Sequence, residues 1–391
     1  MRVRVLALDL AVMVSSFAGL TLFSALLPWI SRDVVITRSD VWLVSALYAA
    51  GVFVSYLVGC VPAIASSPRR VVAFSIASVS ASMALSASAT NAIQLALLRF
   101  VQGFASMTVP VFSAQLSRSF GKATPLALGI LFSGTFVGGA IGYVASSLAT
   151  FIGWRGVYAI FALATALCGA LWLHEAPVER ARRVISLREA RDLWRDPFTL
   201  LWGSSFFAAM WILFTAATLG SSASPAYSKL FGAAIQASMA AWSVIGGALA
   251  YMASRRGGSI HGIGRVQQAC LALAALGALA AMGARSPGEV ILAAVMLGAV
   301  QGASPAFWSL PGVAYSSSEA ELAGFVLGAL SNSAALVGPM TSAALALAAG
   351  IRALWVTLAT VSMLGVVATS LAMRITPPVL LHGHRVRGVR R

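Results

Sequence analysis

The chain has 391 residues, of which 59% are hydrophobic and 10% charged, and its mean hydropathy is +0.88. The hydrophobic share and the mean hydropathy lie far above those of a soluble domain, and the charged share lies far below, so a membrane protein is predicted. The net charge of +16 could suggest a nucleic-acid partner, but the basic residues follow the loops beside apolar runs, where anionic lipid accounts for them, so none is expected.

Apolar runs of about 20 residues, the length that a helix needs to cross a bilayer, recur along the whole chain. They carry Gly, Ala and Ser on several faces and lack the strict alternation of barrel strands, so an all-α membrane protein is expected. Twelve transmembrane helices are predicted, at residues 5–27, 41–64, 71–89, 92–116, 125–150, 154–173, 198–220, 230–253, 262–283, 288–313, 321–349 and 352–373.

One long polar stretch, at residues 174–197, separates six runs from six. Within it, Leu187, Ala190 and Trp194 share a helical face, which fits either an amphipathic helix on the membrane surface or a solvated loop. The predicted organisation is an N-terminal six-helix bundle (1–173), a cytoplasmic linker (174–197), a C-terminal six-helix bundle (198–374) and a basic cytoplasmic tail (375–391).

Most of the 27 Lys and Arg residues fall in segments on the same side of the membrane as the termini. The positive-inside rule then predicts a multi-pass protein of the inner (cytoplasmic) membrane with both termini in the cytoplasm. The first apolar run is too long for a signal peptide and is kept as a helix. Cys60, Cys168 and Cys270 lie within or at the end of apolar runs and are interpreted as small core residues.

The two halves share an internal repeat. The pair Gln102-Gly103 recurs as Gln301-Gly302 in the fourth run of the second half, and a leucine-glycine pair ending at Gly129 recurs at Gly328. The basic pair Arg69-Arg70 recurs as Arg255-Arg256, and all three matches keep the order of the helices. Two pseudo-symmetric bundles of this kind are typical of transporters.

Several motifs resemble those of the major facilitator superfamily, over essentially the full length. The pattern RxxQG, formed by Arg99, Gln102 and Gly103, resembles the signature of proton-coupled members. Two more motifs resemble the drug and sugar efflux branch: Gly134, Gly138 and Gly139, with Thr135 where proline is usual, and the sequence Gly153-Trp154-Arg155.

The loop motif after the second helix of each half departs from that family. Its aspartate, which in the family helps to lock the cytoplasmic gate, is replaced by Ala63 in the first half and by Tyr251 in the second. Basic residues and glycines persist, so the resemblance implies gating or helix packing for Arg69, Arg70, Arg255, Arg256, Gly134, Gly138 and Gly139.

Arg99 is the residue on which the functional interpretation depends. A guanidinium inside a bilayer costs about 2.5 to 3.5 kcal/mol on insertion scales, so it should face water or a partner. At helical spacing Arg99, Gln102, Ser106 and Ser113 form one polar stripe, as expected for a helix that lines an aqueous cavity. The alternative is that Arg99 only ties helices together through backbone carbonyls.

Polar and aromatic side chains at the middle of other spans predict a central site shared by both halves. Each of them could instead join helices or anchor a span at the interface. The candidate substrate-binding residues are Arg99, Gln102, Ser106, Tyr48, Gln236, Trp242, Gln301, Trp308 and Asn332.

Asp9 is the one carboxylate that lies deeper than the first two residues of a predicted span. We hypothesise that it carries a coupling proton that Arg99 perturbs or relays; the alternative is a hydrated aspartate near the cytoplasm. No phosphate-binding loop, HExxH or CxxC motif occurs, so an enzyme, a cofactor and a metal site are not expected.

The resulting expectation is a monomeric secondary transporter that works by alternating access, with a small-molecule substrate, protons as coupling ion and membrane lipids around it. The resemblance favours proton-coupled efflux by an antiporter. The first alternative is a uniporter, exchanger or symporter of a small organic anion with Arg99 as counter-charge. The second is a sensor or a lipid scramblase with a transporter fold.

Overall fold

The computed structural model describes residues 2–175, 186–223, 227–257, 259–316 and 319–377, and all regular structure within them is helical. The spans of the first half are α1 (Arg2–Asp33), α2 (Arg38–Gly59), α4 (Pro68–Ser86), α5 (Ala92–Gln102) continued through η1 (Gly103–Met107) by α6 (Thr108–Phe120), α7 (Thr124–Ala145) and α8 (Ala149–Glu175). Short elements join them: α3 (Pro62–Ala65), η2 (Gly121–Ala123) and η3 (Ser146–Leu148).

The second half repeats this order. Its spans are α10 (Pro197–Ala223), α11 (Ser228–Gly257), α12 (Ser259–Gly283), α13 (Pro287–Gly298) continued through η5 (Ala299–Gly302) by α14 (Ala303–Ser309), α16 (Ala320–Asn332) continued by α17 (Ala334–Ala349), and α18 (Ile351–Ala372). The short α15 (Pro311–Ala314) follows α14.

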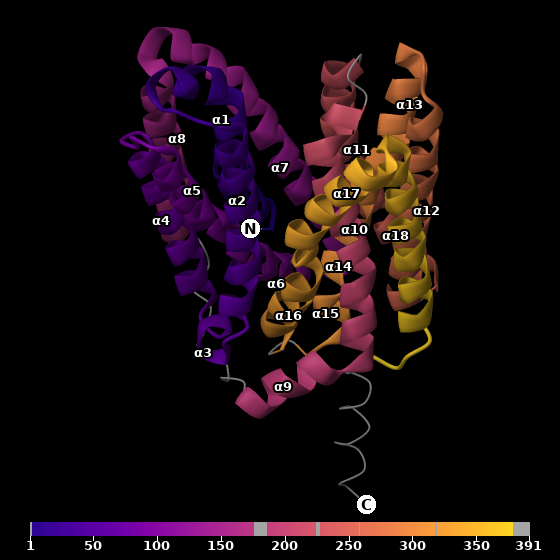
Figure 1. The fold of residues 1–391 in the computed structure, drawn as a ribbon. Helices are drawn as coiled ribbons and strands as arrows, with labels where there is room; N and C mark the ends of the chain where they lie inside the picture. Colours follow the sequence, from indigo (N-terminus) through magenta and orange to yellow (C-terminus); the bar gives the residue numbers. More distant parts are fainter. Residues whose placement is uncertain (1, 176–185, 224–226, 258, 317–318, 378–391) are drawn as a thin grey trace, which may run out of the picture.

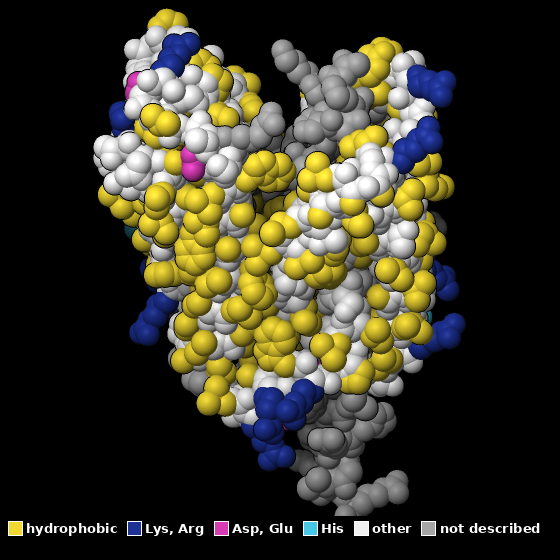
Figure 2. Space-filling model, viewed as in Figure 1, with side chains coloured by type: hydrophobic (Ala, Val, Ile, Leu, Met, Phe, Trp, Pro, Cys, Tyr) yellow, Lys and Arg dark blue, Asp and Glu magenta, His cyan; other side chains and the backbone are white. Residues whose placement is uncertain are grey.

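The described residues include nine apolar helical stretches long enough to cross a membrane. One of them, at residues 92–175, runs through three consecutive spans, and α4 completes the set with two arginines in its first turn. Apolar side chains form a broad belt, with Lys and Arg nearer its ends (Figure 2). The predicted all-α fold of two six-span halves is therefore confirmed, and the chain is a multi-pass membrane protein.

Helix starts are fixed by local side-chain caps. Capping boxes begin α2, through Thr37 and Asp40, and α13, through Ser286 and Glu289. These caps satisfy backbone N–H groups that the first turn of a helix leaves free. Four spans begin three residues earlier than predicted, at Arg2, Arg38, Pro68 and Ser259. Within α8 the backbone leaves the helical conformation at Gly153, directly before the predicted start of that span at residue 154.

The two halves stand side by side, converge at the end of the molecule where α3 and α9 (Leu187–Arg195) lie, and diverge at the opposite end (Figure 1). We call the first end the linker side. The linker forms the amphipathic helix that was one of two predicted alternatives, but its buried Ala190 and Leu193 pack toward α10 and α16. Residues 176–185 of the predicted linker and 378–391 of the predicted tail lie outside the described residues.

Candidate functional site

A cavity of about 340 Å³ lies between the two halves. Residues of α1, α2, α5, α7, α10, α11 and α17 contribute to its walls, together with residues near the breaks η1 and η5. Its volume is at the lower end of the range for small-molecule sites, about 300 to 1,000 Å³. Seven predicted substrate-binding residues line it: Arg99, Ser106, Tyr48, Gln236, Gln301, Trp308 and Asn332.

Arg99 is 5% exposed and reaches the cavity from the last turn of α5. Its Nη1 donates to Gln102 Oε1 at 2.9 Å and to the Gly19 carbonyl at 3.3 Å, while Nε has no hydrogen-bond partner among the described residues. The guanidinium carbon lies 4.6 Å from the centre of the Tyr48 ring, a cation–π arrangement. No carboxylate of the described residues lies within 4.0 Å of it.

Gln102 holds Arg99 from behind the cavity wall. It is 2% exposed, does not line the cavity, and its Nε2 donates to Ser86 Oγ at 3.4 Å. The structure thus places this predicted binding residue as a positioning residue.

Gly103, the last residue of the RxxQG pattern, brings α2 and α5 together. A Cβ atom there would lie 2.6 Å from the Gly51 carbonyl carbon and 2.7 Å from the Tyr48 carbonyl oxygen. Any larger residue would push α2 away. The glycine therefore sets the distance between the Tyr48 ring and the Arg99 guanidinium.

The second half repeats this packing without the cation. Gln301-Gly302 ends the η5 break, and a Cβ atom at Gly246 of α11 would lie 2.5 Å from the Gly302 Cα. Three residues before Gln301, where the first half has Arg99, the chain has Gly298. The Gly298 backbone packs against Ser238, whose Cβ would lie 2.7 Å from an added Cβ. The two halves therefore present different chemistry to the cavity.

An aromatic cluster, Tyr56, Phe132, Phe206 and Trp308, forms part of the cavity wall and joins the halves. The Trp308 ring stacks on Tyr56 with centroids 6.0 Å apart and an interplanar angle of 22°. Phe132 and Phe206 lie 6.5 and 6.4 Å from the Trp308 ring. Tyr56 and Phe132 belong to the first half, and Phe206 and Trp308 belong to the second.

Trp242 does not line the cavity. Its Nε1 donates to the Val295 carbonyl at 3.0 Å and so joins α11 to α13. Asn332 lines the cavity, but its side-chain amide also donates to the Gly328 carbonyl of its own helix at 2.9 Å. The sequence located both at mid-span; the rotation of each helix decides which of them faces the cavity.

Asp9 is fully buried and lies away from the cavity lining. Its Oδ1 accepts a hydrogen bond from Trp172 Nε1 at 2.8 Å, and its Oδ2 has no hydrogen-bond partner among the described residues. Asp9 and Arg99 form no ion pair, and the aspartate is not the hydrated group that was the alternative.

The linker side is closed by contacts between the halves that sequence reasoning missed. Arg118 Nη1, at the end of α6, lies 2.7 Å from Glu321 Oε1 in the first turn of α16, where the carboxylate side chain is only 3% exposed. Deeper in the interface, the Ser113 hydroxyl donates to the Trp308 carbonyl. A sequence signal existed, because a span of the first half ends near Arg118 and a span of the second half begins near Glu321, two residues of opposite charge.

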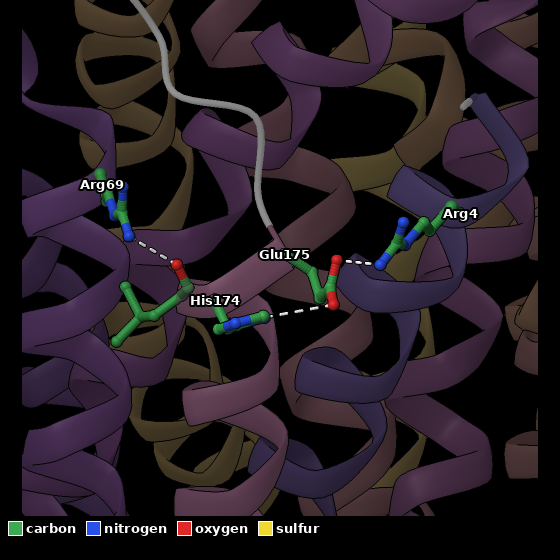
Figure 3. Close-up of polar contacts among 5 residues, drawn as sticks. Arg4, Arg69, His174 and Glu175 are labelled. Atoms are coloured by element: carbon green, nitrogen blue, oxygen red, sulfur yellow. Dashed lines mark hydrogen bonds and ion pairs between the residues drawn. The ribbon is translucent and has the colours of Figure 1, made fainter.

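The two basic pairs, Arg69-Arg70 and Arg255-Arg256, lie away from the Arg118–Glu321 contact. Arg69 Nη2 donates to the Leu173 carbonyl at 2.6 Å, and Arg4 pairs with Glu175, so these residues tie α4 and α1 to the end of α8 within the first half (Figure 3). Arg70 is exposed. Arg255 lies 5.7 Å from the Tyr251 ring centre, and the Arg256 side chain lies outside the described ones. Among these described contacts, none joins the halves.

Gly134, Gly138 and Gly139 pack α7 against α1, inside the first half. A Cβ atom at Gly138 would lie 3.0 Å from the Ala18 nitrogen, and the Gly139 carbonyl accepts a hydrogen bond from Thr21 at 2.8 Å. Another glycine pair, Gly129 of α7 and Gly247 of α11, makes the close crossing between the halves: an added Cβ at Gly247 would lie 3.0 Å from the Gly129 Cα.

The Gly-Trp-Arg motif has a structural role at the end opposite the linker side. Gly153 has φ 71° and ψ 163°, a conformation that essentially only glycine adopts. Trp154 Nε1 donates to Asp33 at 2.8 Å, and Arg155, stacked on the Trp154 ring, donates to the Ala87 and Ala89 carbonyls. The motif fastens α8 to the ends of α1 and α4.

A membrane-embedded cavity between two repeated six-span halves is the arrangement of a secondary transporter. The model of the Major Facilitator Superfamily matches residues 10–335, and the chain belongs to this superfamily. The family points to transport rather than to catalysis. No curated protein sequence matches the chain.

Solved structures show the same fold. The human organic anion transporter MFSD10 (TETRAN) superposes with a TM-score of 0.76 at 16% identity, covering 94% of this chain and 99% of that one. The E. coli fucose:proton symporter FucP superposes with a TM-score of 0.70 at 11% identity, covering 94% and 98%. A FucP structure in the outward conformation gives a TM-score of 0.68 at 11% identity, with the same coverage.

Proposed function

We propose that the chain carries a small organic anion by alternating access, with Arg99 as the counter-charge of the substrate. The observation that carries this proposal is a buried guanidinium on the cavity wall that pairs with no carboxylate among the described residues. A carboxylate, sulfonate or phosphate would supply the charge-assisted hydrogen bonds that Arg99 lacks. The fold shared with an organic anion transporter supports the same class of substrate.

The orientation of the cavity follows from the distribution of basic residues. With both termini in the cytoplasm, as the positive-inside rule predicts, the linker side faces the cytoplasm and the end where the halves diverge faces outward. Rocking of the halves would then close the outer end and open the linker side.

Proton coupling and export stay predictions, and Asp9 supports the first of them. Its carboxyl group is fully buried, and one oxygen has no hydrogen-bond partner among the described residues. Ionisable groups at such positions in membrane proteins are frequently proton carriers. Proton-driven flux that is unchanged in Asp9→Asn would exclude this role.

Flux in proteoliposomes tests the main proposal. Uptake of a fluorescent or radiolabelled aryl carboxylate should fall at least tenfold in Arg99→Gln and partly return in Arg99→Lys, because lysine keeps the charge but loses the planar fork. The melting temperature of purified Arg99→Gln should stay near that of the parent.

Two results would contradict this assignment. Anion flux that Arg99→Gln leaves intact would remove the counter-charge role. A collapse of stability with no ligand effect would favour the alternative in which Arg99 only ties helices. Solute flux in the parent also distinguishes a transporter from a sensor, and an absence of lipid flipping distinguishes it from a scramblase.

A further inference from the structure

We propose that the substrate is a singly charged amphipathic anion with a flat, aromatic body, bound with its charge at Arg99 and its ring on the aromatic cluster. This inference rests on the proposed function and specifies its substrate. It follows from the uneven distribution of charge and aromatic surface along the cavity.

The charge of the substrate follows from the cavity lining. Among the described residues that line the cavity, Arg99 is the one charged side chain. The corresponding position of the second half is Gly298, so the repeat supplies no second cation. A second negative charge on the substrate would be desolvated without a partner, which is strongly unfavourable in a buried site.

The length of the substrate follows from α2, which carries a contact at each end of the site. Tyr48 lies under the Arg99 guanidinium, and Tyr56 stacks on Trp308. The separation of eight positions between Tyr48 and Tyr56 corresponds to about 12 Å along a helix. A charged head and a ring joined by a short spacer span this distance.

The flatness of the substrate follows from the aromatic cluster. The Trp308 ring stacks on Tyr56 and meets Phe206 edge-on at 87°, so the cluster offers both face and edge contacts. Aromatic pairs in these geometries are stabilised beyond the effect of their buried area, and a puckered aliphatic ring lacks the π-system on which this gain depends. Because Tyr56 and Phe132 come from one half and Phe206 and Trp308 from the other, a ring seated there contacts both halves.

Binding of four small probes to the purified full-length protein tests the inference without any mutation. The probes are 4-phenylbutanoate, 4-cyclohexylbutanoate with the same carbon count, the cation 4-phenylbutylamine and the dianion phenylsuccinate. By isothermal calorimetry 4-phenylbutanoate should bind about threefold to tenfold more tightly than the cyclohexyl compound. The amine and the dianion should bind at least tenfold more weakly than 4-phenylbutanoate.

Variants then locate the ring. Trp308→Leu should remove the preference for phenyl over cyclohexyl, and Tyr56→Leu provides the same test from the other half if Trp308→Leu does not fold. Trp242→Leu is the matched control, because Trp242 lies off the cavity, and it should keep the preference.

The failures of the two proposals are distinguishable. If both butanoates bind equally and Arg99→Gln abolishes both, the aromatic inference is overturned and the anion carrier stands. The same conclusion follows if the preference survives both Trp308→Leu and Tyr56→Leu. If the dianion binds as tightly as 4-phenylbutanoate, the single charge is overturned. If no anion binds, or if Arg99→Gln leaves anion binding unchanged, the proposed function itself is overturned.

Discussion

Arg99 is held by residues that do not touch the cavity. Gln102 fixes one nitrogen of the guanidinium, and Gly103 lets α2 approach until the Tyr48 ring lies beneath the charge. The three residues of the RxxQG pattern thus act together: Gln102 orients the Arg99 guanidinium, and Gly103 allows the Tyr48 ring to contact it. Spacing along a helix predicted the stripe, but the position of Gln102 behind the wall depends on the neighbouring helix that carries Ser86.

Gly153 should be intolerant of substitution for reasons of backbone conformation alone. No atom lies within 4 Å of a Cβ built there, yet its φ of 71° is strained for any L-residue with a side chain. Gly153→Ala should cost about 1 to 3 kcal/mol and lower the melting temperature. Gly232→Ala, in open space within α11, is the control and should be neutral or slightly stabilising. Equal melting temperatures for the two variants would contradict the prediction.

At the scale of elements, α6 and α16 close the linker side with an ion pair that does not depend on the loop aspartate of the family. Ala63 and Tyr251 stand at that aspartate's positions, while Arg118 and Glu321 meet across the halves. The ion pair between the halves therefore lies on α6 and α16 and not at the loop that follows the second span of each half.

Breaking this ion pair should open the linker side. In a single-cysteine background carrying Ser113→Cys, which is fully buried between the halves, Arg118→Glu should raise the rate of maleimide labelling about tenfold, equivalent to about 1.4 kcal/mol. The double variant Arg118→Glu/Glu321→Arg should return the rate toward that of the parent. Labelling that is unchanged in the single variant would show that other contacts hold the gate.

The spans were predictable because hydropathy reports the thickness of the bilayer directly. The contacts between spans were not, because they depend on how each helix is rotated and which half it meets. Trp242 and Trp308 look alike in sequence, yet one joins α11 to α13 and the other lines the cavity. Likewise Gly138 and Gly129 lie on the same helix, but of these two only Gly129 packs against the second half.

At the scale of the whole molecule, the divergence of the halves predicts access from one end. In a background without Cys60, Cys168 and Cys270, Ser45→Cys should be labelled by a membrane-impermeant maleimide added on the side opposite α9, because Ser45 is exposed and lines the cavity. Ser113→Cys should react slowly from that side. A bound aryl carboxylate should slow labelling of Ser45→Cys. Faster labelling from the linker side would contradict the orientation.

Gly298 occupies the position in the second half that corresponds to Arg99, and this limits where a second cation can be placed in the cavity. Gly298 is buried against Ser238, and the Met239 nitrogen would lie 3.3 Å from a Cβ atom added at Gly298. Packing therefore excludes an arginine at position 298, and a variant designed to carry a doubly charged substrate would need its second cation at another position on the cavity wall.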